Sequence, residues 1–177
     1  MTLLEWFPLA LVCLMGAATP GPSLAIIAST TVENGLTAGR LASVSHAIAV
    51  GLYALGAVLG LAALFKLFPL VAKILMYSGA AYLAYLGAKL LLAKNSDASS
   101  NSKKSQASGS KEGVKQAFLI AFLNPKLAIF FFALFSQFIP AGGTSAVLTF
   151  TLVGTVLIID MLWYLAVVQF IDKVKHK

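Results

Sequence analysis

Long apolar segments separated by short polar stretches dominate this chain. Five such segments are found, at about residues 3–32, 41–65, 68–92, 116–139 and 145–171. A membrane-spanning helix needs about 20 mostly apolar residues, and each segment exceeds that length. No charged residue lies between Arg40 and Lys66, and only Asp160 lies between Lys126 and Asp172. The pattern predicts an all-α, polytopic membrane protein with five transmembrane helices.

One long polar stretch interrupts this pattern. Residues 95–112 are rich in serine and show no apolar periodicity, which is typical of a flexible linker. The linker divides the chain into two membrane parts. The first, at 1–94, holds three helices, and the second, at 113–177, holds two helices and a short basic tail.

Two apolar segments contain prolines where a helix would otherwise continue, in TPGPS at 19–23 and NPK at 124–126. Proline lacks a backbone donor and clashes with the preceding turn, so we expect both helices to break. Irregular backbone at membrane depth is tolerated only inside protein or against a water-filled cavity. The predicted substrate-binding residues are therefore Thr19, Pro20, Gly21, Pro22, Ser23, Asn124, Pro125 and Lys126. The alternatives are a kink that only improves packing and a Lys126 side chain that extends to the membrane surface.

The two breaks also belong to a weak internal repeat. PSLAII at 22–27 resembles PKLAIF at 125–130, at an offset of 103 residues. Each repeat would hold three helices, an odd number. The second copy would therefore be inserted upside down relative to the first, as in many secondary transporters. The same offset places the counterpart of the third segment at 171–195, beyond Lys177. We therefore expect a 3+3 inverted-repeat plan in which the sixth helix is missing.

Two ionisable residues inside apolar segments are candidates for proton coupling. Asp160 lies near the middle of the fifth segment and His46 lies in the second. An acid in a low-dielectric surrounding favours its neutral form, so Asp160 could load and release a proton. The alternatives are a structural Asp160 that pairs with Lys126 or freed backbone amides, and a His46 that only packs.

Composition agrees with the membrane class and excludes several others. The chain is 59% hydrophobic and 11% charged, whereas soluble domains carry about 25% charged residues. Its net charge of +7 does not indicate nucleic-acid binding, because six of the thirteen basic residues fall between Lys89 and Lys115. Such clusters set membrane orientation by the positive-inside rule. We expect the linker and C-terminus in the cytoplasm and, with five crossings, the N-terminus outside.

Other chemistry finds no support in the sequence. Cys13 is the single cysteine, so neither an intrachain disulfide nor a pair of redox cysteines is expected. No nucleotide-binding loop, metal-ligand cluster or cofactor motif is found. We expect the chain not to be an enzyme and to need no cofactor.

Several motifs together resemble one family of transporters. They are TPGPS at 19–23, Gly39-Arg40-Leu41, SGAAYLAYLGAKLL at 78–91, AFLNPKLAIFFFALFSQFIP at 121–140, and Trp163-Tyr164 beside Asp160. These residues resemble the lysine exporter and homoserine/threonine resistance superfamily (LysE/RhtB) of bacterial amino-acid exporters. The resemblance implies a six-helix protein of the inner membrane that exports an amino acid or related small metabolite by proton antiport.

Three alternatives stay open at this point. The missing helix is consistent with a truncated, transport-inactive remnant of such an exporter, or with a homodimer in which a second copy fills the gap. An intramembrane hydrolase would use Ser23 as nucleophile and His46 as base. The expected partners are a small-molecule substrate, protons and the lipid bilayer.

Overall fold

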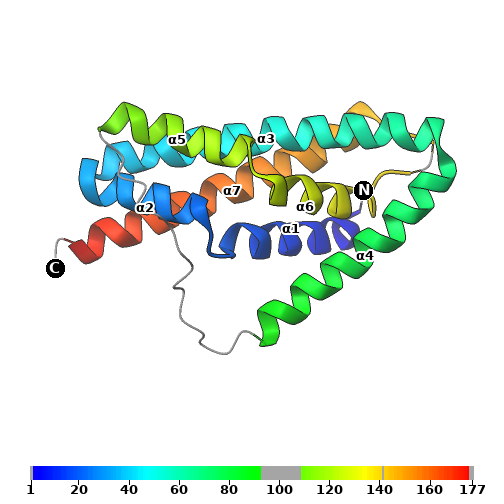
Figure 1. Ribbon diagram of the computed structural model, residues 1–177, viewed down its shortest axis with the longest axis horizontal. Helices are drawn as coiled ribbons and strands as arrows, with labels where there is room; N and C mark the ends of the chain where they lie inside the picture. The colour runs from blue at the N-terminus through cyan, green and yellow to red at the C-terminus, as the bar shows by residue number, and fades with distance from the viewer. Residues whose placement is uncertain (1, 93–108, 141, 176–177) are drawn as a thin grey trace. The chain divides into compact units, whose positions relative to one another are not determined.

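The chain folds as a set of helices (Figure 1). The computed structural model describes residues 2–92, 109–140 and 142–175. These residues form seven helices and no strand: α1 (Leu3–Ala18), α2 (Pro22–Asn34), α3 (Leu36–Leu67), α4 (Pro69–Leu92), α5 (Ser110–Phe122), α6 (Pro125–Phe135) and α7 (Ala146–Lys175). The predicted all-α class is confirmed.

Local capping explains where the first helices begin and end. The Thr2 hydroxyl accepts a hydrogen bond from the Glu5 N–H, and the Glu5 carboxylate accepts one from the Thr2 N–H at 2.7 Å. This reciprocal capping box starts α1. Gly35 has a φ of 85° and ends α2, because glycine adopts this left-handed conformation without steric cost. A single residue therefore separates α2 from α3.

The helices have the length and composition of membrane spans. Two segments, Leu36–Leu64 and Ala146–Lys175, are each long and apolar enough to cross a membrane. The pairs α1–α2 and α5–α6 are also long and apolar enough when each interrupted pair is taken as one span. The expected crossing at 68–92 forms α4, but several of its side chains lie outside the described residues. That fifth crossing stays a prediction.

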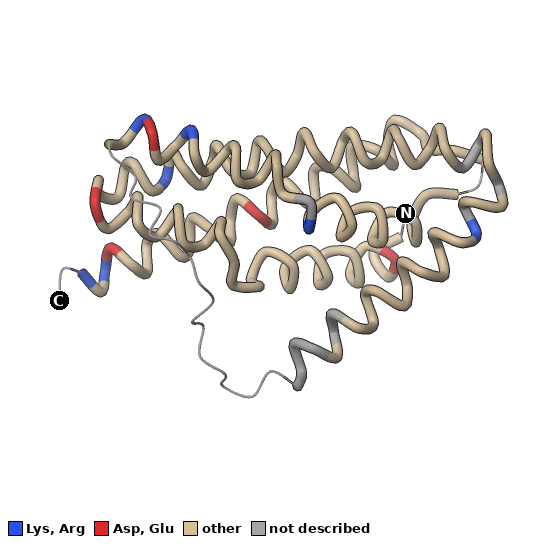
Figure 2. Tube along the Cα trace, viewed as in Figure 1, with Lys and Arg blue, Asp and Glu red and all other residues tan. Residues whose placement is uncertain are grey.

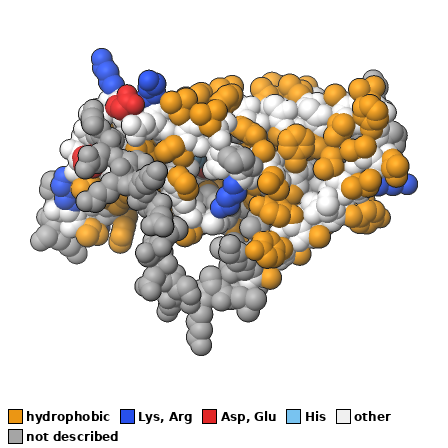
Figure 3. All heavy atoms as spheres, viewed as in Figure 1, with side chains coloured by type: hydrophobic (Ala, Val, Ile, Leu, Met, Phe, Trp, Pro, Cys, Tyr) orange, Lys and Arg blue, Asp and Glu red, His pale blue; other side chains and the backbone are white. Residues whose placement is uncertain are grey.

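The helix surfaces confirm the membrane class. On α3, the side chains of Leu41, Ile48 and Leu52 are exposed, whereas Ala42 and His46 on the other side are buried. Apolar residues therefore face outward and a polar one faces inward, the reverse of a water-soluble helix. Figure 3 shows hydrophobic side chains over much of the visible surface. This is an all-α polytopic membrane protein.

The chain divides into two compact units, each built from several stretches of sequence. Unit 1 combines 1–52, 99–124 and 154–177, and unit 2 combines 53–98 and 125–153. Both units thus take segments from both sides of the predicted linker. The predicted division into 1–94 and 113–177 describes sequence repeats rather than these units, and it stays a prediction.

Unit 1 has a core of small and branched residues between α2, α3, α5 and α7. Its buried members are Ile26, Ile27, Ala42, Ala117, Tyr164 and Val168. Helices α2 and α5 lie side by side (Figure 1). A Cβ atom added at Gly113 would lie 2.5 Å from the Thr30 hydroxyl oxygen. The absence of a side chain at Gly113 therefore permits this close approach.

Unit 2 is built around α4 and α6. A Cβ atom added at Gly79 would lie 2.9 Å from the Ala133 Cα atom, so these helices also approach closely at a glycine. The Gln137 side-chain amide donates a hydrogen bond to the Met76 carbonyl at 2.8 Å. A small residue at a helix contact and a polar contact between helices are both typical of membrane helix packing.

Three helices extend further into polar sequence than predicted. Helix α3 begins at Leu36, so Arg40 lies on a helix rather than in a loop, and α5 begins at Ser110, inside the predicted linker. Helix α7 continues to Lys175 through the predicted polar tail. Lysine and arginine are good helix formers, so the helices continue beyond the apolar residues. The rest of the linker, 93–108, lies outside the described residues.

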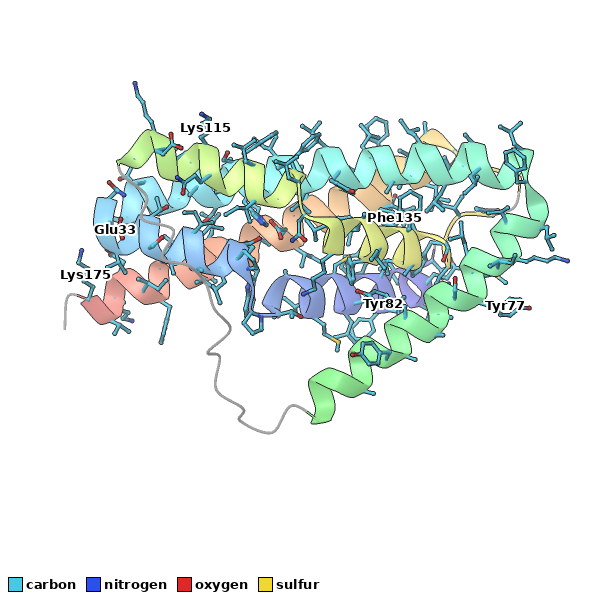
Figure 4. The ribbon with its side chains drawn as sticks, viewed as in Figure 1. Glu33, Tyr77, Tyr82, Lys115, Phe135 and Lys175 are labelled. Atoms are coloured by element: carbon cyan, nitrogen blue, oxygen red, sulfur yellow. The ribbon has the colours of Figure 1, made fainter. Side chains whose placement is uncertain are left out.

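Charged residues gather in unit 1 where α2 meets α3, at the start of α5 and at the end of α7 (Figure 2). We call this the charged end; it comprises Glu33, Arg40, Lys111, Glu112, Lys115, Asp172, Lys173 and Lys175. Figure 4 labels Glu33, Lys115 and Lys175 there. The Lys175 ammonium donates a hydrogen bond to the Val32 carbonyl at 2.7 Å. A lysine thus satisfies one of the last carbonyls of α2, which favours a cation.

Candidate functional site

The first predicted break is present in unit 1. Helix α1 ends at Ala18 and α2 begins at Pro22, and the two axes are bent by 62°. Pro22 occupies the first helical position, where its missing N–H costs nothing and its fixed φ suits a helix start. Thr19, Pro20 and Gly21 form the connection.

The break exposes two helix ends of opposite polarity. Thr19 caps α1, because its N–H donates to the carbonyls of Met15 and Gly16 and its hydroxyl donates to Met15 at 2.8 Å. Gly21 caps α2 without a side-chain hydrogen bond. The first N–H groups of a helix have no partner within it and favour an anion, while the last carbonyls favour a cation.

Directly after the break, Ser23 turns into the interior of unit 1. It is the second residue of α2 and is buried. Its side chain lies beside that of Tyr164 on α7. Ser23 therefore lies where the start of the broken helix meets α7.

A buried acid–base pair lies next to this contact. The His46 Nδ1 atom lies 2.8 Å from the Asp160 carboxylate, and the two residues are 3% and 7% exposed. The rings of Tyr164 and His46 meet edge to face, with centroids 4.8 Å apart. The carboxylate also lies within electrostatic reach of the buried Cys13 thiol on α1. Residues from α1, α3 and α7 thus lie around the pair.

The two ring nitrogens of His46 differ in their hydrogen bonding. A carboxylate oxygen can only accept, so Nδ1 carries the hydrogen whenever Asp160 is ionised. The other ring nitrogen of His46, Nε2, is buried and makes no hydrogen bond within the described part of the chain. With the hydrogen on Nδ1, Nε2 presents a lone pair, an acceptor that the described residues leave unused.

The structure brings together only part of the predicted site. His46 and Asp160 form one pair, and Ser23 lies beside Tyr164, whose ring contacts His46. Thr19, Pro20, Gly21 and Pro22 precede Ser23 in the chain. The second break lies between α5 and α6, with Asn124 in unit 1 and Pro125 and Lys126 in unit 2. Lys126 is exposed at the start of α6. A role for that second break in the same cavity stays a prediction.

The sequence did not predict which side chains meet in this part of unit 1. His46 and Asp160 are separated by 114 residues, and nothing local indicates that they meet. Its position in the sequence is a weak indication that Tyr164 lies near Asp160, because Tyr164 follows Asp160 by four residues and so shares its helix face. The hydrolase alternative would need Ser23 hydrogen-bonded to His46, but His46 Nδ1 pairs with Asp160 and His46 Nε2 has no hydrogen-bond partner in the described part of the chain.

Comparison with known proteins identifies the family of this chain. The family described as LysE type translocator matches residues 14–176. The chain belongs to the LysE type translocator family. It is therefore a membrane transport protein, and the resemblance noted from its motifs is confirmed.

Several relatives of this translocator are similar over most of their length. The membrane protein YrhP of Bacillus subtilis (strain 168) is 29% identical over 181 residues, which cover 98% of this chain and 85% of YrhP. A leucine efflux protein of Salmonella typhimurium (strain LT2) is 31% identical over 154 residues, covering 83% and 69% of the two chains. That of Enterobacter sp. (strain 638) is 28% identical over 155 residues, covering 85% and 71%. No solved structure matches this chain.

Proposed function

We propose that this translocator exports an amino acid or a related small metabolite across the cell inner membrane by proton antiport. The observation that carries the proposal is the buried His46–Asp160 pair beside the broken helix. In this scheme the substrate binds at the break and the proton binds at the pair. Relatives named leucine efflux protein make leucine the first substrate to test.

The break suits a zwitterion such as a free amino acid. The amide end of α2 attracts the carboxylate, and the carbonyl end of α1 attracts the ammonium. Each such attraction contributes up to about 2 kcal/mol in a partly buried geometry. The predicted residues Asn124, Pro125 and Lys126 at the second break are a further candidate binding position, where Lys126 would hold a carboxylate.

The pair suits proton exchange. In the membrane interior a lone charge is costly, but an aspartate beside a histidine can accept a proton without leaving an isolated charge. Substrate export and proton entry would then alternate at two neighbouring sites in unit 1. Alternating access would follow the inverted-repeat plan expected from the sequence.

The test is export by purified protein in proteoliposomes with an imposed pH gradient. We expect leucine, or another member of an amino-acid panel, to move against its concentration gradient. Asp160→Asn should reduce this driven movement to the rate of protein-free vesicles, because the near-isosteric amide cannot exchange a proton. Asp172→Asn, in the same helix at the charged end, is the matched control and should keep wild-type activity.

A second variant distinguishes a loss of proton coupling from a folding defect. Changing one partner of a buried hydrogen-bonded pair can leave the polar group of the other unsatisfied, which costs about 1–3 kcal/mol. The double variant His46→Gln with Asp160→Asn removes both partners and should insert normally yet fail to couple. Full driven efflux by Asp160→Asn contradicts proton antiport at this site. No movement of any amino acid by the wild-type chain favours the transport-inactive remnant.

A further inference from the structure

Helices α2 and α5 lie side by side between the first break and the charged end of unit 1 (Figure 1). Helix α2 runs from the break to the charged end, and α5 runs back from the charged end to Phe122. They approach closely at Gly113, where an added Cβ atom would lie 2.5 Å from the Thr30 hydroxyl oxygen. Thr30 lies on α2 between the break and the charged end, so this contact lies along the way from that end to the break.

The hydroxyl of Thr30 is buried at this contact without a hydrogen bond. Thr30 is 0% exposed, and its Oγ1 atom has no partner among the residues that the structure describes. A helical threonine can donate to the carbonyl four residues earlier, but the Ile26 carbonyl already accepts the Ser29 hydroxyl at 3.1 Å. An unsatisfied buried hydroxyl disfavours the packed arrangement, whereas water satisfies it once the two helices separate.

The neighbouring threonine on α2 gives the contrast. Thr31 is 2% exposed, and its hydroxyl donates to the Ile27 carbonyl at 2.7 Å. It lies against Gly39 on α3 rather than against α5. The contact of α2 with α3 is therefore satisfied at Thr31, while its contact with α5 carries an unsatisfied group at Thr30.

We propose that the contact between α2 and α5 is a gate between the charged end and the substrate site, and that the Thr30 hydroxyl favours its open state. The structure described above is the closed state. The inference rests on the proposed function, in which substrate binds at the break. Thr30 is a positioning residue in this scheme, because it acts on the equilibrium of the gate and does not hold the substrate.

The first test removes the hydroxyl and keeps the shape of the side chain. For Thr30→Val we expect the Tm in detergent to rise, because the closed contact no longer buries an unsatisfied group. Leucine efflux from proteoliposomes, measured at internal leucine below the KM, should fall about 5-fold or more, since an unsatisfied hydroxyl shifts the gate equilibrium by at least about that factor. A purely structural role would not raise stability and lower transport together.

Thr31→Val is the matched control, because it removes an adjacent buried hydroxyl that already has a partner. It relieves nothing at the contact between α2 and α5. We expect its Tm not to rise and its leucine efflux to stay at the wild-type rate.

The second test observes opening without measuring transport. In a Cys13→Ala background, Thr30→Cys and Thr31→Cys are compared for their reaction with N-ethylmaleimide in membranes. Both positions are buried when the gate is closed. Opening uncovers position 30 and leaves position 31 against α3, so we expect Thr30→Cys to react about 5-fold faster or more.

Three outcomes overturn the proposal. They are a Tm of Thr30→Val at or below the wild-type value, unchanged leucine efflux by Thr30→Val, and equal reaction rates of the two cysteines. Failure of the proposed function appears separately, as full driven movement by Asp160→Asn or as no movement of any amino acid by the wild-type chain. The maleimide reaction still decides in that case whether α2 and α5 separate.

Discussion

At the scale of single residues, four polar side chains within the apolar segments are placed inward. Ser23, His46, Asp160 and Tyr164 are all at most 9% exposed, while large apolar side chains such as Leu52 face outward. A buried charge is costly unless it is paired, so the contact between His46 and Asp160 makes both residues tolerable. The sequence indicated these two residues separately, and the structure makes them one site.

Gly21 gives a test of the predicted substrate site. Its φ of −167° is an extended conformation open to any residue, and a Cβ atom there would meet only the Thr19 carbonyl oxygen, at 3.9 Å. We expect Gly21→Ala to insert and fold normally but to raise the KM for leucine, because the methyl group occupies space beside the helix ends. The measurement is leucine efflux as a function of internal concentration.

Gly56→Ala is the control for Gly21→Ala. A Cβ atom at Gly56 would meet nothing within 4 Å, and this position lies outside the proposed site. An unchanged KM for Gly21→Ala would show that the substrate does not approach this part of the break.

At the scale of helices, glycine decides which elements approach closely. Gly56 and Gly60 form a GxxxG pattern, which is typical of membrane helix packing, yet a Cβ atom at either meets nothing within 4 Å. The close contacts instead occur at isolated glycines, including Gly113 and Gly39. At Gly39 an added Cβ would overlap the Thr31 hydroxyl, which gives a physical reason for glycine in the Gly39-Arg40-Leu41 motif.

The contact between α2 and α5 can be measured through Gly113. In Gly113→Ala the new Cβ would lie 2.5 Å from the Thr30 hydroxyl oxygen and 2.7 Å from its Cγ2 methyl carbon. Overpacking of this kind costs about 1–3 kcal/mol. We expect a lower Tm in detergent for Gly113→Ala, and recovery when Thr30→Ala removes the clashing atoms.

Gly154→Ala provides the reference for this comparison. Gly154 lies inside α7, and a Cβ atom there meets nothing within 4 Å. Both substitutions gain the same helix propensity of up to about 1 kcal/mol, so their difference isolates the contact. Equal stability of the two variants would show that α2 and α5 do not approach as closely as described.

At the scale of the whole molecule, the charged end predicts orientation. Five basic residues of unit 1 gather there: Arg40, Lys111, Lys115, Lys173 and Lys175. The positive-inside rule then places this end in the cytoplasm. With five crossings, the N-terminus and the loop near Gly142 would lie outside.

Single-cysteine labelling tests this orientation, because Cys13 is the only native cysteine. In a Cys13→Ala background, Leu3→Cys and Gly142→Cys should react with an impermeant maleimide in intact cells. Val174→Cys, at the charged end, should react only after permeabilisation. These positions are all exposed, so burial does not explain a lack of labelling. Reaction of Val174→Cys in intact cells would reverse the proposed topology.

The sequence by itself determined the class of this protein, its apolar segments and the break at Pro20-Gly21-Pro22. These features are local, because hydropathy depends on composition and proline breaks a helix through its own ring. It also singled out Asp160 and His46, since an ionisable group in an apolar segment is costly wherever it lies.

Only the tertiary structure decided which of these residues meet. The His46–Asp160 contact spans 114 residues of sequence, and Ser23 on α2 lies beside Tyr164 on α7. The structure also decided which glycines face another helix and how far α3, α5 and α7 extend into polar sequence. Such contacts depend on how helices rotate and pack against each other, and the periodicity of one helix does not contain that information.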